Sequence, residues 1–211
     1  MHPTAYNSCK RFYDCYGKYF DNPKVADVGS YDVNGTVKDI FSNCDYLGID
    51  IADGPNVDLV LKEPYKYPFE DNTFDIVVST SCFEHNEMFW ITFLETMRVL
   101  KPEGIFYLNA PSNGGFHRCP VDCWRFWPDA GHALVTWAKY NNLNVALLES
   151  YIAHDENGGN DFVAVFVKDE SYAQKMPDRI IKNYSDYYNG KKYGTDQIFN
   201  NHHMLNKIVE K

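Results

Sequence analysis

The sequence lacks any long run of apolar residues. No stretch approaches the roughly 18 apolar residues that mark a membrane-spanning helix, so we expect no membrane span. The first ten residues are polar and lack the apolar centre of a signal peptide. A concentrated basic segment is also missing, and the formal net charge is -9. Because nucleic-acid-binding proteins usually present a basic face, we expect no nucleic-acid partner.

The six cysteines lack the spacing of a disulfide framework or of a closed zinc site. None forms a Cys-x-x-Cys pair, and the Cys-x-x-x-Cys pair that follows His117 does not match the usual zinc patterns. We therefore expect reduced thiols, a cytoplasmic protein and no metal site. A divalent cation held by Asp122 with Asp155 or Glu156 is left open as an alternative.

Strand-like and helix-like segments are what the chain does contain, and their order predicts an α/β fold. The early strands alternate with helices and should be parallel, whereas the last two are joined by a loop and should be antiparallel. We expect one domain over residues 1–211, with a helical cap (1–22), a core (23–168) and a helical or partly ordered extension (169–211). The predicted strands cover residues 24–28, 45–50, 57–61, 75–79, 105–110, 145–151 and 161–167, and the predicted helices 5–20, 35–41, 86–100 and 129–141.

The first strand runs into a glycine-bearing turn, which predicts a ligand site. Gly29 lets the backbone approach a ligand closely, and a helix after the turn would add its N-terminus. Asp50 ends the next strand, where a carboxylate can accept hydrogen bonds from a ribose diol. A nicotinamide-dependent oxidoreductase is disfavoured, because Ser30 and Tyr31 follow Gly29 where the dinucleotide fingerprint needs a second glycine.

Four motifs, taken in order, resemble the class I S-adenosylmethionine-dependent methyltransferases. They are Asp27-Val28-Gly29-Ser30 with Gly35, Gly48-Ile49-Asp50, residues 68–79 and Arg98-Val99-Leu100-Lys101-Pro102-Glu103-Gly104. The resemblance implies a Rossmann-like fold with a seven-stranded, mostly parallel sheet, an antiparallel last strand and helices on both faces. It also implies S-adenosylmethionine as cofactor and S-adenosylhomocysteine as product.

This resemblance assigns a set of cofactor-binding residues. Asp27 would bind the ammonium group of the cofactor and Asp50 its ribose, although a helix cap and a turn aspartate are the plainer alternatives. The predicted cofactor-binding residues are Asp27, Gly29, Ser30, Tyr31, Asn34, Asp50, Ile51, Ser79 and Ser81.

A narrower resemblance lies in residues 110–114 and 117–129, which are similar to methyltransferases of polysaccharide and surface-glycan biosynthesis. Their implied acceptor is a sugar hydroxyl, whose high pKa calls for a general base. His117 is the first candidate, Asp122 is a base or an orienting group, and His85, beside Glu84, ranks second; tethering of the loop is the alternative role. The predicted substrate-binding residues are Arg118, Trp124, Arg125 and Trp127, with buried packing as the alternative for the aromatic ones.

Three readings therefore compete for the function. The first is a sugar or glycan O-methyltransferase, and the second is a methyltransferase of a small metabolite or of a protein side chain. The third is a cofactor-binding but inactive module of a glycosyltransferase assembly. A homodimer and an association with glycosyltransferase domains are both left open.

Overall fold

An eight-stranded sheet forms the centre of the computed structural model, which describes residues 3–154 and 160–202. The strand order is β3-β2-β1-β4-β5-β7-β6-β8. The first five strands pair in parallel, β7 is antiparallel to both of its neighbours, and β8 is antiparallel to β6. The strands are β1 (Lys24–Val28), β2 (Asp45–Asp50), β3 (Leu59–Val60), β4 (Phe74–Thr80), β5 (Leu100–Pro111), β6 (Ala146–Ala153), β7 (Asp161–Val167) and β8 (Tyr187–Lys192).

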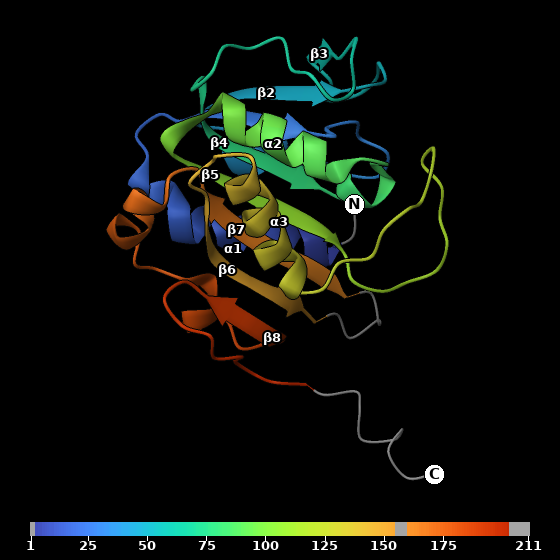
Figure 1. Cartoon of the computed structure of the whole chain (residues 1–211). Coiled ribbons are helices and arrows are strands. Elements are labelled where there is room, and N and C mark those ends of the chain that lie inside the picture. The colour runs from blue at the N-terminus through green and yellow to red at the C-terminus, as the bar shows by residue number, and fades with distance from the viewer. Residues whose placement is uncertain (1–2, 155–159, 203–211) are drawn as a thin grey trace.

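Helices cover both faces of the sheet, as predicted (Figure 1). The helices α2 (Phe89–Val99) and α3 (Asp129–Tyr140) lie on one face, and α1 (Pro3–Tyr16) lies on the other. Short 3-10 helices complete the set: η1 (Gly17–Tyr19), η2 (Lys38–Phe41), η3 (Phe83–His85), η4 (Glu170–Lys175) and η5 (Ile180–Lys182). In the described part of the chain, no helix has the length and apolar character that crossing a membrane requires.

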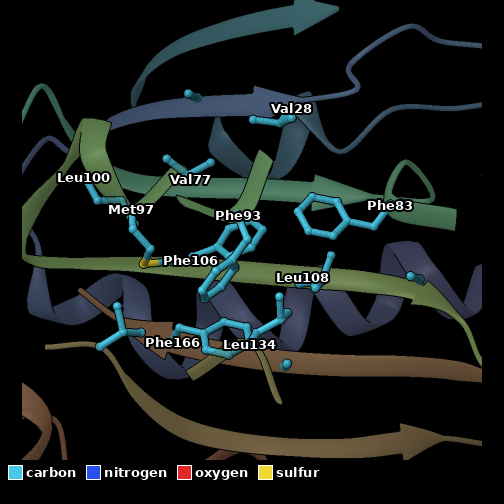
Figure 2. Packing of buried hydrophobic residues seen from close by; sticks show 14 of the residues in the cluster. Val28, Val77, Phe83, Phe93, Met97, Leu100, Phe106, Leu108, Leu134 and Phe166 are labelled. Atoms are coloured by element: carbon cyan, nitrogen blue, oxygen red, sulfur yellow. The ribbon is translucent and has the colours of Figure 1, made fainter. Parts of the chain in front are cut away.

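The core on the α2 side is built from aromatic and aliphatic side chains at helical and strand spacing (Figure 2). Phe93 and Met97 lie one turn apart on α2 and are fully buried. The Phe93 ring packs edge-on against Phe166 of β7, with centroids 5.0 Å apart. Each such side chain contributes about 1.5–3 kcal/mol by burial. This packing fixes β4, β5 and β7 against α2, and these strands support the loops at their ends.

Several predicted features differ from the structure. The predicted strand 57–61 is reduced to Leu59–Val60 in β3, and the predicted strand 105–110 begins at Leu100 in β5. Residues 35–41 do not form a regular helix; only η2 is helical there, because the segment is too short for a stable helix and Asp32 captures the amide of Gly35 in a local turn. The first strand is therefore not followed by a helix N-terminus. The C-terminal extension also supplies an eighth strand, β8, whose Asn189 and Gly190 mask its strand character in the sequence.

The buried Glu149 of β6 connects helix α1 and the C-terminal extension to the sheet. Its carboxylate accepts hydrogen bonds from the Tyr16 hydroxyl at 2.6 Å, from Ile180 N at 2.7 Å and from Ile181 N at 3.1 Å. The last residue of α1 and the extension therefore meet at one buried acid.

Replacing Glu149 with alanine is expected to lower the free energy of unfolding by about 3 kcal/mol, because three buried donors lose their acceptor. Urea denaturation followed by circular dichroism measures the change. The matched control is Glu70→Ala, which removes an exposed glutamate and should stay within about 0.5 kcal/mol of the parent. Equal effects of the two substitutions would show that Glu149 is not the anchor.

Candidate functional site

A cavity of about 1370 Å³ opens at the carboxyl ends of β1, β2 and β4. The order of the strands reverses between β1 and β4, and ligands of open α/β sheets bind outside such a switch point. Most of the lining residues come from four segments, 27–37, 49–53, 80–87 and 111–121. The last of these belongs to a long loop that extends beyond the strand ends (Figure 1).

The turn after β1 approaches β4 too closely for any side chain at position 29. Gly29 has a φ of +81°, and a Cβ atom there would lie 2.4 Å from the Cβ of Cys82. Ser81, on the β4 side, also has a positive φ, of 53°, and its amide donates to the carbonyl of Asn109. The structure thus brings both residues to the cavity, as predicted, and Gly29 is there because only glycine fits.

Asp50 lies at the carboxyl end of β2 and organises the rim of the cavity. Its carboxylate accepts hydrogen bonds from Tyr31 N at 3.0 Å and from Ala52 N at 3.1 Å. Tyr31 and Ile51 flank it with side chains that are 40% and 52% exposed. Tyr31, Asn34, Asp50 and Ile51 all line the cavity, which is where the sequence predicts them to be.

Asp27 lies deeper, at the base of the cavity, and its side chain is almost fully buried. The Tyr46 hydroxyl donates a hydrogen bond to its Oδ2 at 2.5 Å. Burial raises the pKa of the Asp27 carboxyl to about 7 despite that bond, and the nearby Asp50 carboxylate adds to the rise. A cationic group bound beside Asp27 would favour its ionised form and lower this pKa again.

Several predicted residues do not line the cavity. Ser79 is completely buried, and its hydroxyl donates to the carbonyl of Val28 at 2.8 Å, so it joins β4 to β1 instead. Arg118 is exposed on the outside of the loop. The remaining residues outside the lining are Asp122, Trp124, Arg125 and Trp127.

Asp122 and Arg125 form the internal brace of the loop. The Arg125 guanidinium donates to both carboxylate oxygens of Asp122, at 2.6 and 2.9 Å, and this pairing holds the pKa of the Asp122 carboxyl well below its usual range. The same carboxylate accepts the backbone amide of His117 at 2.7 Å. Asp122 is therefore placed to orient His117, not to accept a proton itself, and Asp155 and Glu156 lie outside the described residues.

The loop is also tied to the segment that follows β4. The amides of Cys123 and Trp124 donate to the carbonyl of Glu84, at 2.7 and 3.2 Å, and the Trp124 indole donates to the carbonyl of Asn86 at 3.0 Å. These bonds fix the loop across the mouth of the cavity.

Glu84, His85 and His117 meet at the loop side of the cavity, and all three line it. The two imidazole rings contact edge to face with centroids 5.0 Å apart. His85 Nε2 lies 3.6 Å from Glu84 Oε1. Glu84 is 1% exposed, and its burial raises its pKa to about 8. The structure thus brings His117 and His85 together as candidate bases and adds Glu84 as a full member of the group.

Sequence reasoning missed two contributors to this site, Tyr46 and Asp161. Tyr46 is the partner of Asp27, and nothing in its local sequence indicates that contact. Asp161 lines the cavity from the start of β7 and is brought there only by the antiparallel course of that strand. Thr80, which the sequence places with Ser79 and Ser81 at the ligand edge of the sheet, also lines the cavity, from the end of β4.

Comparisons with known proteins agree on the fold. Residues 35–108 match the sequence model of a methyltransferase domain. The 1,6-didemethyltoxoflavin-N1-methyltransferase of Burkholderia thailandensis, solved with S-adenosylhomocysteine, is 14% identical with a TM-score of 0.61 over 79% of each chain. The chain has the fold of the class I S-adenosylmethionine-dependent methyltransferases. YcgJ of Bacillus subtilis shares this methyltransferase fold at 14% identity and a TM-score of 0.56, over 80% of this chain and 100% of its own.

The methyltransferase fold alone does not settle the reaction. The [4+2]-cyclase SpnF is also similar, with 12% identity and a TM-score of 0.54 over 77% of this chain and 82% of its own. A comparison with curated proteins finds no match. The chemistry must therefore be argued from the residues of the cavity.

The cavity fits S-adenosylmethionine, the cofactor that this fold implies. Ser30 Oγ and Thr80 Oγ1 are buried polar atoms that have no hydrogen-bond partner among the described residues, and both residues line the cavity. Buried polar atoms of this kind need a partner, which a polar ligand would supply. Gly29 provides the close backbone approach, and Asp50 provides the rim carboxylate.

Proposed function

We propose that this chain is an S-adenosylmethionine-dependent methyltransferase that methylates a hydroxyl group of a sugar or glycan. The observation that carries the proposal is the pairing of two acids, Asp27 and Asp50, around the Gly29 turn at the switch point, with Glu84, His85 and His117 across the same cavity. One end of the cavity is thus equipped for a cationic, diol-bearing cofactor and the other for proton removal.

The acids and the turn assign the cofactor end. Asp50 would accept hydrogen bonds from the ribose hydroxyls, and Asp27 would face the ammonium group, directly or through water. The buried Ser30 hydroxyl would gain a partner in the same ligand. Tyr31 and Ile51 would flank the adenosine with their exposed apolar surfaces.

Glu84, His85 and His117 would form the end of the cavity that binds the acceptor. When bound, the cofactor supplies a methyl group on a sulfonium, which moves to the acceptor oxygen as the carbon–sulfur bond breaks and its electron pair stays on sulfur. His117 is placed to take the hydroxyl proton, with His85 as the second candidate. Asp122 acts through His117 by holding its backbone amide.

Exposed aromatic and basic side chains around the loop support a sugar as the acceptor. Trp124 and Trp127 are 37% and 46% exposed, and Phe116 is 79% exposed. Aromatic faces of this kind stack against the C–H faces of sugars. Arg118 lies on the same loop and would donate hydrogen bonds to acceptor hydroxyls, although none of these residues lines the cavity itself.

A small metabolite is the alternative acceptor. It is favoured by the Burkholderia neighbour, which was solved with bound 1,6-didemethyltoxoflavin. An inactive cofactor-binding module, with or without glycosyltransferase partners, is the remaining possibility for the same cavity.

Incubation of the protein with methyl-labelled S-adenosylmethionine and a panel of acceptors tests the proposal. The panel contains hexose and deoxysugar glycosides, small phenols and amines, and an unrelated protein. We expect label on a glycoside only. Label on a phenol, an amine or the protein would overturn the sugar assignment, and the absence of label on every acceptor, with the cofactor bound, would favour the inactive module.

The elevated pKa of Asp27 predicts how cofactor affinity depends on pH. Its carboxyl is mostly protonated at pH 6 and ionised at pH 8, because its folded pKa is about 7. Since only the ionised form attracts an ammonium group, the dissociation constant of S-adenosylhomocysteine should fall about tenfold from pH 6 to pH 8. Calorimetry at pH 6, 7 and 8 measures it. Asp27→Asn should flatten this dependence; an unchanged slope would remove Asp27 as its source.

A further inference from the structure

Glu84, His85 and His117 offer a carboxylate and two imidazoles to one point of the cavity. One ligand atom from each residue can be chosen so that all three atoms lie within 4.8 Å of one another. Glu84 Oε1 and His85 Nε2 are 3.6 Å apart. Ligand atoms around a tetrahedral zinc ion lie about 3.4 Å apart. His117, whose side chain is 53% exposed, has room to close the remaining distance.

Backbone carbonyls contact both imidazole rings. His85 Nδ1 contacts the carbonyl of Val121 at 2.5 Å, and His117 Nδ1 contacts the carbonyl of Gly115 at 3.1 Å. A carbonyl can only accept, so His85 Nδ1 carries the proton and its Nε2, the atom beside Glu84, keeps its lone pair. His117 Nδ1 lies between its carbonyl and the Arg125 guanidinium, a donor 3.4 Å away. Metal-binding histidines are usually oriented by this kind of outer contact.

Glu84 supplies a second and independent observation. Its carboxylate is buried, and its Oε2 atom has no hydrogen-bond partner among the described residues. The two terminal nitrogens of Arg125 are engaged with Asp122, and Glu84 Oε2 stays unpaired although Arg125 Nε is itself without a partner among the described residues. A buried carboxylate without a partner is costly, and a cation at the cluster would remove this cost.

We propose that Glu84, His85 and His117 bind one divalent first-row transition-metal ion and leave coordination positions open toward the cavity. One carboxylate and two imidazoles form the donor set of open zinc sites and of facial-triad metal sites. Mg²⁺ is disfavoured because it prefers an oxygen-rich shell. A role of the ion in catalysis rests on the proposed function. The binding of the ion to these three residues does not depend on it.

The site would define how the acceptor is held. A sugar presents vicinal hydroxyls, and the open positions of the ion accept one or two of their oxygens. Coordination lowers the pKa of the hydroxyl, so its proton can pass to water. His117 then acts as a ligand and no longer as the base.

Metal titration of the chelator-treated full chain tests the site. Calorimetry with Zn²⁺ at pH 7.5 should show one ion per chain. Glu84→Gln, His85→Asn and His117→Asn should each weaken binding more than about 100-fold, since loss of an outer partner alone costs about 10- to 100-fold. His132→Asn, which removes an exposed histidine of α3, is the matched control and should change nothing. Zn²⁺ binding as tight as that of the parent in the Glu84→Gln or His117→Asn variant, or binding of Mg²⁺ alone, would overturn the proposal.

Cobalt spectroscopy distinguishes this site from the exposed thiols of Cys119 and Cys123. Co²⁺ bound by oxygen and nitrogen should give d–d bands without a thiolate charge-transfer band. A charge-transfer band that survives in His117→Asn would place the metal on the cysteines and contradict the proposal.

Binding of S-adenosylhomocysteine separates this inference from the proposed function and shows that the variants are folded. His117→Asn should lose Zn²⁺ and keep the nucleoside ligand, whereas Asp50→Ala should lose the nucleoside ligand and keep Zn²⁺. Zn²⁺ binding without cofactor binding in the parent protein would sink the proposed function and leave the metal site. The reverse result would sink the metal site alone.

Discussion

Replacing Asp50 with alanine is expected to weaken S-adenosylmethionine binding by about 100-fold. The carboxylate stands at the rim of the cavity and is the assigned acceptor of the ribose hydroxyls. Two charge-assisted hydrogen bonds of about 1.5 kcal/mol each account for this loss. The substitution also frees the amides of Tyr31 and Ala52, which Asp50 now holds. Calorimetry with S-adenosylhomocysteine measures the change.

The matched control is Asp45→Ala. Asp45 begins the same strand, β2, at its amino end and is exposed away from the cavity, so its loss should leave affinity within about twofold of the parent. Asp50→Asn keeps one acceptor oxygen and should give an intermediate loss. If Asp50→Ala and Asp45→Ala bind equally well, Asp50 does not hold the ribose.

Replacing His117 with asparagine is expected to slow methyl transfer by about 100-fold or more while the cofactor affinity stays near that of the parent. General-base assistance contributes about 10²- to 10⁴-fold, and ligation of a cation by the same ring would make its loss equally severe. The side chain lines the cavity from the loop, whereas the proposed cofactor contacts, Asp27 and Asp50, belong to β1 and β2. Single-turnover assays with labelled cofactor give the rate, and calorimetry gives the affinity.

The exposed histidine of α3 again supplies the control, since His132→Asn should transfer methyl at the parent rate. An unchanged rate in His117→Asn would remove His117 from the reaction, both as base and as ligand. A parallel loss of cofactor affinity would instead show that the loop supports the cofactor end.

The parts of the fold that were predicted correctly have strong local signals. β1, β2 and β7 have the predicted bounds, because each is a short apolar run between polar turns, which fixes where the strand begins and ends. The antiparallel β7 follows from the loop connection between the last two core strands and is confirmed by its pairing with β5 and β6. The turn at Gly29 follows from the steric need for glycine there.

The parts that differ depend on distant contacts. Residues 35–41 are mostly weak helix formers, and the turn at Asp32 and the brevity of the segment leave only η2. β8 has weak strand residues and exists because β6 offers an unpaired edge. β4 ends at Thr80, one residue beyond the predicted end at Ser79. The Ser79 hydroxyl bonds to the carbonyl of Val28 in β1, whereas Thr80 lines the cavity.

The acceptor end shows the same limit most clearly. Glu84 and His85 are adjacent in sequence, and nothing local indicates that the loop brings His117 back to them. Asp122 is acidic and near His117 in the sequence, which made it a candidate base, but Arg125 takes both of its oxygens. Only the folded course of the loop gives Glu84 and Asp122 their different environments.

Isothermal titration calorimetry of the parent protein with S-adenosylmethionine, S-adenosylhomocysteine and NAD tests the central claim most directly. The cavity at the switch point, with Asp27, Gly29 and Asp50 around it, predicts one binding site for each of the two sulfur ligands and none for NAD. Absence of heat and of any thermal shift with both sulfur ligands would contradict the account, and binding of NAD in their place would assign the cavity to a different cofactor.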